Sequence, residues 1–299
     1  MAPAPLPLRD GLDPTRLRLP NSSAWHTVLQ YLVTRFPHDA ERLREKVAAR
    51  EVVDGSGVPI TERTPFVSHT FVYLYRDPPE ETPVPFSLRV LHRDDDLLVV
   101  DKPHFLATTP RGAHVVESAL VRLRRELESS DISPAHRLDR LTAGVLVFTL
   151  RPEIRSAYQS MFAERKVTKT YEAIAPYRAD LHLPATVRSR IVKERGRLQA
   201  YESEGEPNSE TVVEIVERHG GHARYRLTPT TGKTHQLRVH LSSLGIPITG
   251  DNFYPTFYDV PADDYSSPLR LLARSLEFDD PLTGLRRTFR SERTLSWPA

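Results

Sequence analysis

A single carboxylate among cations is the feature of this sequence most suited to chemistry. Asp139 lies between Arg137 and Arg140, in the stretch from His136 to Gly144, and an apolar run follows directly. If the segment is extended, Asp139 and Arg137 leave the same face, because side chains alternate along a strand. Nearby positive charge favours an ionised carboxylate. The pattern therefore indicates either a structural ion pair, which is the commoner outcome, or a nucleophile.

Two further blocks of residues follow this segment in order. They are Lys169–Ala173 (KTYEA) and Thr231–His240 (TGKTHQLRVH), and the second continues to Asp251. Together with HRLDRLTAGVLVF they resemble the motifs of the RluA family of RNA pseudouridine synthases, whose H-R-L-D-R-x-T-S-G segment carries a nucleophilic aspartate. The resemblance covers about residues 86–291. Its departures remove no group that the chemistry needs, and they are Leu141, Ala143 and Lys233.

The resemblance implies a role for each candidate residue. Asp139 would be the nucleophile, Tyr171 a proton-transfer residue stacked near the target base, and Arg238 the partner of the catalytic carboxylate. Arg137 would help to occupy the space that an extruded base leaves. The same blocks supply the other candidate substrate-binding residues, which are His136, Arg140, His235 and Lys169. The implied activity is an isomerase that converts specific uridines of structured RNA, ribosomal or transfer RNA or both, without any cofactor.

Two other kinds of protein are compatible with parts of this pattern. An RNA-binding protein on the same fold, without catalysis, would use Asp139, Arg137 and Arg238 only as a structural network. The presence of all three together with Tyr171 argues against that alternative. A nucleoside glycosidase would need paired catalytic carboxylates, and no second acid accompanies Asp139 in its segment.

Neither a nucleotide cofactor nor a metal is expected. Gly232-Lys233-Thr234 is similar to the end of a phosphate-binding loop, but Leu227 stands where that loop needs its first glycine. His235 and His240 are five residues apart, which does not suit a helical zinc pair, and the chain has no cysteine.

Composition sets broad limits on the protein. The chain has 299 residues, of which 39% are apolar and 27% charged, and the absence of cysteine excludes disulfides and thiolate catalysis. No apolar run approaches the length of a membrane span, and the proline-rich N-terminus lacks a signal core. We therefore expect a cytoplasmic protein, and we expect it to be monomeric.

RNA binding would have to come from local charge, since the formal net charge is only +2. Residues 177–210 form the most basic stretch, which we predict to be a mobile strand-loop that contacts RNA backbone. Its cations are Arg188, Arg190, Lys193, Arg195 and Arg197.

The positions of the prolines and the spacing of the apolar residues divide the chain into parts. Residues 1–24 are predicted to be an irregular leader, and two short amphipathic helices should follow over 25–36 and 40–47. With short strands near 52–60 and 71–75, this part is weakly similar to an S4-type RNA-binding module. The proline-rich segment 77–85 is the predicted linker. The predicted domains are therefore 1–76 and 86–299.

The larger domain is predicted to be α+β, with a mixed, largely antiparallel sheet bent around a cleft and flanked by helices, as the family resemblance implies. Strands are expected at 87–90, 97–103, 167–175, 212–216 and 225–227, helices at 116–127 and 152–162, and a closing hairpin at 269–289. A further helix should bury Leu237, Leu241 and Leu244 and turn Arg238 and His235 toward the cleft.

Overall fold

The computed structural model describes residues 4–78 and 80–298. They divide into an N-terminal unit, which runs to Glu80 and includes Arg125–Ser130, and a C-terminal unit, which comprises Glu81–Arg124 and the residues from Asp131 onward. None of the helices in the described residues has the length and apolar character that crossing a membrane requires. In the same residues, no cluster of three or more His, Asp or Glu side chains is arranged to hold a metal ion.

The N-terminal unit combines two helices with a small antiparallel sheet of order β1-β3-β2. Its elements are β1 (Thr15–Arg18), α1 (Val28–Arg35), the short 3-10 helix η1 (Pro37–Asp39), α2 (Ala40–Ala48), β2 (Val53–Asp54) and β3 (Phe71–Leu74). The Thr27 side chain caps α1 by accepting the Gln30 N–H, and Pro37 interrupts the helical path before α2. The two predicted helices are confirmed, whereas the similarity to an S4-type module stays a prediction.

Burial of apolar side chains at helical spacing explains the core of this unit. Val28 and Leu32 of α1 pack with Leu43 and Val47 of α2, and each such side chain contributes about 1.5–3 kcal/mol when it is fully buried. The prediction of an irregular leader over residues 1–24 is wrong at β1, which pairs with β3. Half-buried Thr15 and Leu17 alternate there with exposed Arg16 and Arg18, and this period of two is that of a strand.

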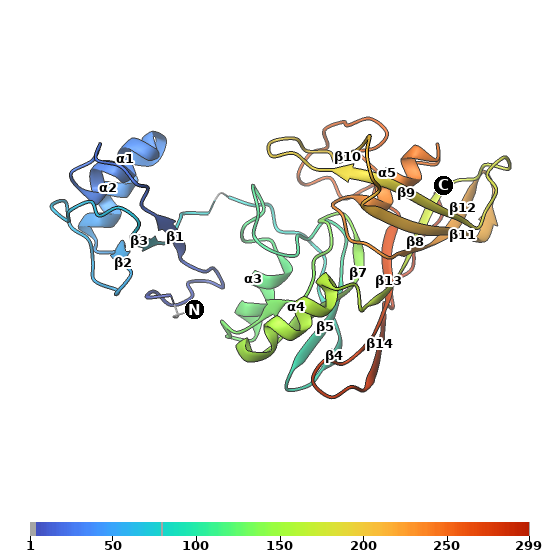
Figure 1. The fold of residues 1–299 in the computed structure, drawn as a ribbon, viewed down its shortest axis with the longest axis horizontal. Coiled ribbons are helices and arrows are strands. Elements are labelled where there is room, and N and C mark those ends of the chain that lie inside the picture. Colours follow the sequence, from blue (N-terminus) through green and yellow to red (C-terminus); the bar gives the residue numbers. More distant parts are fainter. Residues whose placement is uncertain (1–3, 79, 299) are drawn as a thin grey trace. The chain divides into compact units, whose positions relative to one another are not determined.

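One mixed sheet organises the C-terminal unit, in agreement with the predicted fold class. Hydrogen-bonded neighbours follow the order β10-β9-β11-β12-β8-β13-β7-β5-β4, with β14 on β13 and β6 on β7. The strands are β4 (Arg89–Arg93), β5 (Leu97–Lys102), β6 (Ser133–Pro134), β7 (Ala143–Thr149), β8 (Thr168–Pro176), β9 (Ala185–Val192), β10 (Tyr201–Ser203), β11 (Ser209–His219), β12 (His222–Pro229), β13 (Leu271–Asp279) and β14 (Arg286–Arg290). Figure 1 shows the bend of this sheet: β9, β11 and β12 run across the view, whereas β4, β5 and β14 run down it.

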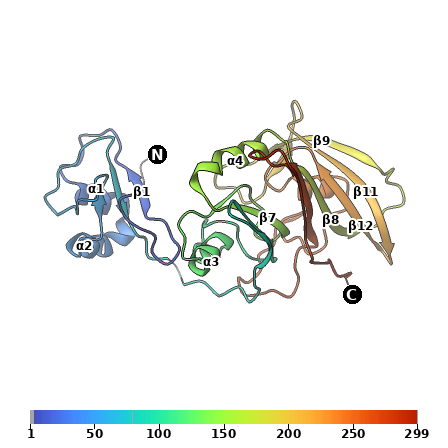
Figure 2. The same ribbon diagram turned by 90° about the horizontal axis from the view of Figure 1, so that it is seen from below.

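Four helical segments accompany the described strands of this sheet. They are α3 (Ala119–Glu126), the 3-10 helix η2 (Pro152–Ile154), α4 (Arg155–Ala163) and α5 (Gln236–Ser243). In Figure 2, α3 and α4 lie on opposite sides of β7. Because both faces of β7 are therefore covered, every residue of that strand is buried, which explains its continuous apolar sequence.

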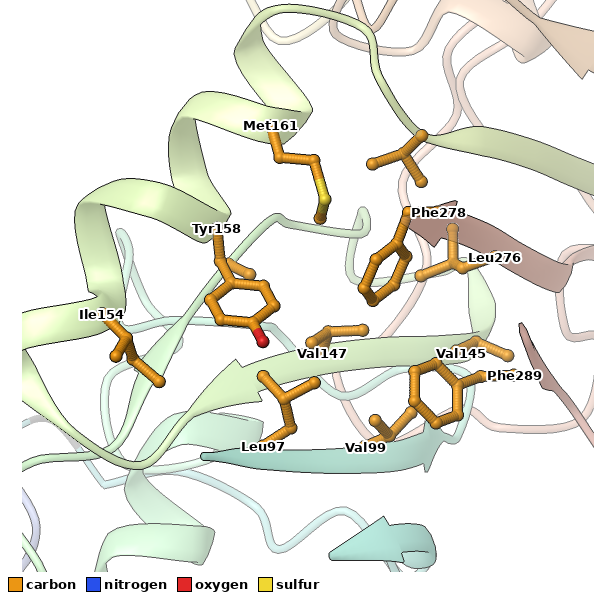
Figure 3. Packing of buried hydrophobic residues seen from close by; sticks show 12 residues of the cluster. Leu97, Val99, Val145, Val147, Ile154, Tyr158, Met161, Leu276, Phe278 and Phe289 are labelled. Atoms are coloured by element: carbon orange, nitrogen blue, oxygen red, sulfur yellow. The ribbon is translucent and has the colours of Figure 1, made fainter. Parts of the chain in front are cut away.

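The main core lies between α4 and the sheet. Tyr158 and Met161 of α4 pack over Val145 and Val147, alternate residues that leave the same face of β7. Figure 3 shows these side chains converging with Leu97 and Val99 of β5, Leu276 and Phe278 of β13, and Phe289 of β14. The last three residues belong to the predicted closing hairpin, which is confirmed as the antiparallel pair β13–β14.

Gly144 permits a close approach between β7 and β13. Within the described residues these strands form the one parallel pair of the sheet, with Gly144 opposite Ala273. Gly144 has a φ of +116°, and a Cβ at this position would lie 2.2 Å from the Ala273 carbonyl oxygen. Any other residue would be strained and would collide with backbone. The glycine that ends the Asp139 segment therefore lets β13 lie beside the start of β7.

The structure adds detail to two predicted segments. Residues 177–210 contain the regular strands β9 and β10, and β9 pairs with β11. The boundary between the two units falls inside the predicted linker 77–85, and the second half of that segment belongs to the C-terminal unit. The Glu81 carboxylate accepts the backbone N–H groups of Val115, Val116 and Glu117 at 2.6–3.0 Å. The boundary between the units therefore falls before Glu81.

Candidate active site

Asp139 lies in a loop that the neighbouring backbone holds in place. Leu138 and Leu141, on either side of Asp139, are each 7% exposed and anchor the loop in the core. The Thr108 hydroxyl donates to the Leu138 carbonyl at 2.8 Å and accepts the Leu138 N–H at 3.1 Å. His104 Nδ1 donates to the Leu141 carbonyl at 2.8 Å. The loop is therefore fixed independently of the Asp139 side chain.

Lys102, the last residue of β5, is fully buried next to the same loop. Its Nζ donates to the carbonyl oxygens of Pro103, Leu106 and Arg140 at 2.9, 2.8 and 3.2 Å. Burial lowers the pKa of Lys102 to about 7, and the charge of Asp139 acts in the opposite direction. Three carbonyl acceptors match the three N–H groups of an ammonium. The charged form of Lys102 is therefore the one that satisfies every acceptor.

A pocket of about 120 Å³ opens beside Asp139. It lies where the Asp139 loop, β8, the end of β12, the start of α5 and β13 meet. Its lining residues are Arg137, Leu138, Asp139, Thr142, Lys169, Tyr171, Pro229, Thr231, Gly232, Lys233, His235, Gln236, Leu237, Arg238 and Leu271. Most of the candidate residues from the sequence are thus brought together, whereas His136 and Arg140 do not line this pocket.

Arg238 lies between two carboxylates, Asp251, which is buried, and Asp139, which is partly exposed. Its Nε and Nη2 donate to Asp251 at 2.8 and 2.6 Å, while its Nη1 lies 4.0 Å from Asp139 Oδ2. Burial opposes the charged guanidinium, but the hydrogen bonds to Asp251 outweigh it, so the pKa of Arg238 is raised. The Asp251 side chain is fully buried, and that of Asp139 is 34% exposed. Arg238 is therefore oriented by Asp251 and presents its remaining edge to Asp139.

Tyr171 reaches the pocket from β8. Burial, and then the charge of Asp139, raise the pKa of its phenol. Because the phenol keeps its proton at neutral pH, Tyr171 can donate a hydrogen bond or take part in proton transfer. The next residue, Glu172, leaves the opposite face of the strand and accepts hydrogen bonds from Arg274. Only the tyrosine of this pair lies in the pocket lining.

His235 begins α5 in the left-handed conformation, with a φ of +58°. Its Nδ1 lies 2.9 Å from the Tyr254 hydroxyl. That hydroxyl donates its one hydrogen to the Ala200 carbonyl at 2.8 Å, so His235 Nδ1 must be the donor in this contact. Burial lowers the pKa of His235, and the charge of Asp139 acts in the opposite direction. In the neutral ring, Nε2 is then a hydrogen-bond acceptor.

Comparison with known proteins identifies the family of this chain. A family model described as RNA pseudouridylate synthase matches residues 96–243. The dual-specificity RNA pseudouridine synthase RluA of Haemophilus influenzae is 33% identical over 214 residues, which are 69% of this chain and 93% of that protein. RluA of Escherichia coli K12 is 33% identical over 72% of this chain and 95% of its own length. The chain belongs to the RluA family of RNA pseudouridine synthases.

A solved structure supports the fold as well. Human RNA pseudouridylate synthase domain containing 4 superimposes with a TM-score of 0.53 at 26% identity, over 70% of this chain and 88% of that one. The protein is thus an isomerase that acts on uridines of RNA, and a non-catalytic RNA-binding role is disfavoured.

Two of the candidate substrate-binding residues of this pseudouridine synthase, His136 and Arg140, do not line the pocket. The His136 ring stacks on Phe162 with centroids 4.3 Å apart, and its Nε2 accepts the Val147 N–H at 3.2 Å. Burial, and then the charge of Lys169, lower the pKa of His136 to about 3. Burial likewise lowers the pKa of Arg140. The structure thus ties His136 to the core, not to the pocket.

The helix α5 differs from its predicted amphipathic form, because its residues from Gln236 to Leu241 are all buried. The polar ones have partners inside the protein. Gln236 donates to the Glu210 carbonyl and the Thr211 hydroxyl, both at 2.9 Å. His240 Nδ1 lies 2.9 Å from that same hydroxyl. These contacts attach α5 to β11 and fix the position of Arg238.

Sequence reasoning missed three supporting residues of the synthase site. Lys102 holds the Asp139 loop, Asp251 orients Arg238, and Tyr254 orients His235. Each lies in a stretch whose likeness to the family was recognised without a role being assigned. A lysine that ends a strand beginning with four apolar residues, as in LLVVDKP, was a usable signal, because lysine is rarely buried without a reason.

Proposed function

We propose that Asp139 is the nucleophile with which this chain converts uridine to pseudouridine. One observation carries the proposal. Within residues 4–78 and 80–298, no group donates a hydrogen bond to the Asp139 carboxylate, although it lines the pocket and has the Arg238 guanidinium 4.0 Å away. An ionised carboxylate without donors, next to a fixed counter-charge, is suited to attack.

The remaining groups match the other steps of the reaction. The N1–C1′ bond of uridine breaks and a C5–C1′ bond forms, while C5 loses a proton and N1 gains one. Asp139 attacks either C1′ of the ribose or C6 of the uracil, and both routes need a proton to move between base atoms. Tyr171, a neutral phenol in the pocket, supplies a group for that transfer. Arg238 places a positive charge 4.0 Å from Asp139 Oδ2 and helps to orient that carboxylate.

The substrate is a uridine extruded from structured RNA. Arg137 occupies the space that the base leaves, and Lys169 and His235 contact the nucleotide in the pocket. Extrusion costs a few kcal/mol and costs least in loops and bulges, so exposed uridines of ribosomal or transfer RNA are the proposed targets. A relative of 32% identity is named ribosomal large subunit pseudouridine synthase D in Vibrio vulnificus. We also propose that a monomer is active.

Pseudouridine mapping tests this proposal. RNA from cells that lack the protein should lose pseudouridine at one or a few sites. Wild-type protein should restore those sites, whereas Asp139→Asn at equal abundance should not. Full restoration by Asp139→Asn would remove Asp139 from the mechanism. Loss of no site at all would argue against an RNA target in those cells.

We also propose that the N-terminal unit increases affinity for RNA or changes site choice without taking part in the chemistry. The pocket lining lies wholly within the C-terminal unit, which supports this division. A chain that begins at Pro78 keeps Glu81, whose carboxylate binds three backbone N–H groups. This shortened chain should modify RNA with weaker binding or altered sites. A folded but wholly inactive shortened chain would contradict the division.

A further inference from the structure

A row of aromatic rings leads from the active-site pocket to the protein surface. His235, in the pocket lining, contacts the Phe253 ring edge-on at 5.4 Å, and Phe253 contacts Phe257 in the same manner at 5.4 Å. The guanidinium of Arg238 lies over the Phe253 ring at 4.8 Å. Phe253 is half-buried, whereas Phe257 is 39% exposed. The row therefore begins at the site of chemistry and ends in solvent.

The loop that carries these rings is attached to the catalytic site. Asp251 binds Arg238 and also accepts the backbone N–H groups of Phe253 and Tyr254 at 2.8 and 3.2 Å. The same carboxylate thus orients the arginine and fixes the path of the loop toward Phe257. An isolated exposed aromatic residue needs no explanation. Phe257, in contrast, belongs to a loop that Asp251 attaches to Arg238, so the position of its ring relative to the pocket is fixed.

A basic hairpin borders this aromatic row. The turn between β9 and β10 bonds to the loop, because the Gln199 amide donates to the Phe253 carbonyl and Ala200 N–H donates to the Tyr254 hydroxyl at 2.8 Å. Helix α5 lies beside β9 (Figure 1). Lys193 in this hairpin is close enough for its charge to act on His235. Arg195 and Arg197, further along the turn, are exposed.

Exposed aromatic rings next to cations are the combination that binds unpaired nucleotides. Bases stack on the rings, and lysine and arginine contact the phosphates. An RNA whose uridine enters the pocket must also pass its neighbouring nucleotides over the pocket rim. We propose that Phe257 stacks on the base of a nucleotide directly adjacent to the target uridine, with Arg195 contacting the RNA backbone there, and that this subsite contributes to the choice of uridine. The inference rests on the proposed function.

The test is a double-mutant cycle with the full-length protein. The probe is a short RNA stem-loop that carries a uridine modified by the wild type, made also with an abasic nucleotide on the 5′ or on the 3′ side of that uridine. Stacking on one base is worth about 1–3 kcal/mol. Phe257→Ala should therefore weaken binding of the intact RNA by roughly 5- to 150-fold. The single-turnover rate at saturating protein should stay within about twofold of wild type, and Phe257→Trp should restore binding.

The cycle identifies the stacked base directly. On one of the two abasic RNAs, Phe257→Ala should cause no further loss of affinity. Arg195→Ala should weaken intact and abasic RNAs equally and lower the salt dependence of binding, as expected of a phosphate contact. Leu285→Ala, which removes an exposed apolar side chain in the turn before β14, is the matched control and should change neither quantity.

The outcomes separate this inference from the proposed function. Equal losses for Phe257→Ala on the intact RNA and on both abasic RNAs, or wild-type affinity in Phe257→Ala, would overturn the stacking subsite while leaving the catalytic proposal intact. Loss of the saturating rate in Phe257→Ala, with affinity unchanged, would also overturn it. Failure of the wild type to form pseudouridine in any RNA would instead overturn the proposed function.

Discussion

The C-terminal unit contains the same three residue types, Asp, Tyr and Arg, in two different settings. In the first, Asp280 accepts hydrogen bonds from Tyr158 at 2.9 Å and Arg287 at 3.2 Å. It also accepts the backbone N–H groups of Leu282 and Thr283. In the second setting, Asp139 has Tyr171 and Arg238 as neighbours, yet no described residue donates a hydrogen bond to its carboxylate.

The difference lies in how the oxygens of each carboxylate are used. Asp280 is 3% exposed, and although burial opposes it, the backbone and Tyr158 hydrogen bonds hold its pKa below the ordinary value. Such a group stabilises the turn between β13 and β14 and has no lone pair to offer a substrate. The arginine near Asp139 gives its best hydrogen bonds to Asp251 instead. Residue type therefore does not separate these two carboxylates, whereas the number of hydrogen bonds that each accepts from described residues does.

The two tyrosines should give the largest contrast. Tyr171→Phe should lower the single-turnover rate by about 10²–10⁴-fold, the usual range for a lost proton-transfer group, with little change in melting temperature. Tyr158→Phe should leave the rate of the folded protein unchanged and cost about 1–3 kcal/mol of stability, because the buried Asp280 loses a donor. Rates and thermal melting of both variants measure this. The opposite pattern would reverse the assignment of the two settings.

Arg238 is proposed to assist Asp139 in the reaction, and it also neutralises the buried Asp251. A pair of substitutions should separate these two roles. Arg238→Ala leaves the fully buried Asp251 carboxylate without its partner, which should cost about 3–5 kcal/mol of stability, and it should also lower the rate. Adding Asp251→Asn removes the stranded charge. The double variant should recover much of the stability and none of the rate. Recovery of the rate would mean that Arg238 serves only Asp251.

His136 lies three residues before Asp139, yet we expect it to stabilise the fold and to take no part in the chemistry. Its pKa is about 3 in the folded chain and about 6.5 when unfolded. Between these values the unfolded state binds more protons, so His136 contributes stability above pH 6.5 that is lost as pH falls toward 3. His136→Gln should flatten this slope by at most about 1.4 kcal/mol per pH unit. The exposed His38→Gln is the control, and an unchanged slope in His136→Gln would contradict the assignment.

Much of the fold followed from local pattern, and the exceptions have physical causes. The strand around Tyr171 and the closing hairpin were predictable because apolar residues recur at the right period. Residues 177–210 were predicted only as a mobile strand-loop, and the bounds of β9 were not recognised, since its solvated face carries Arg188 and Arg190. Charged composition concealed a strict alternation of half-buried and exposed positions.

The candidate site was likewise predictable from the sequence only in part. Asp139, Tyr171 and Arg238 were identified by their motifs, and the structure brings them to one pocket. The residues that hold them in place, Lys102 and Asp251, do so through contacts between distant parts of the chain, which the spacing of apolar residues does not reveal. Lys102 reaches the Asp139 loop from 38 positions away in sequence, through Arg140, and the pairing of Asp251 with Arg238 requires the loop after α5 to fold back.

We propose that Asp139 is the nucleophile, whereas Asp280 stabilises the fold. The most direct measurement is the single-turnover rate of Asp139→Asn beside Asp280→Asn, together with melting temperature and RNA affinity, on an RNA that the wild type modifies. We expect no pseudouridine from Asp139→Asn, with melting temperature and affinity close to wild type. Asp280→Asn should melt at a lower temperature and keep its rate when assayed below its melting transition. Pseudouridine formation by Asp139→Asn at a rate near wild type would contradict the account.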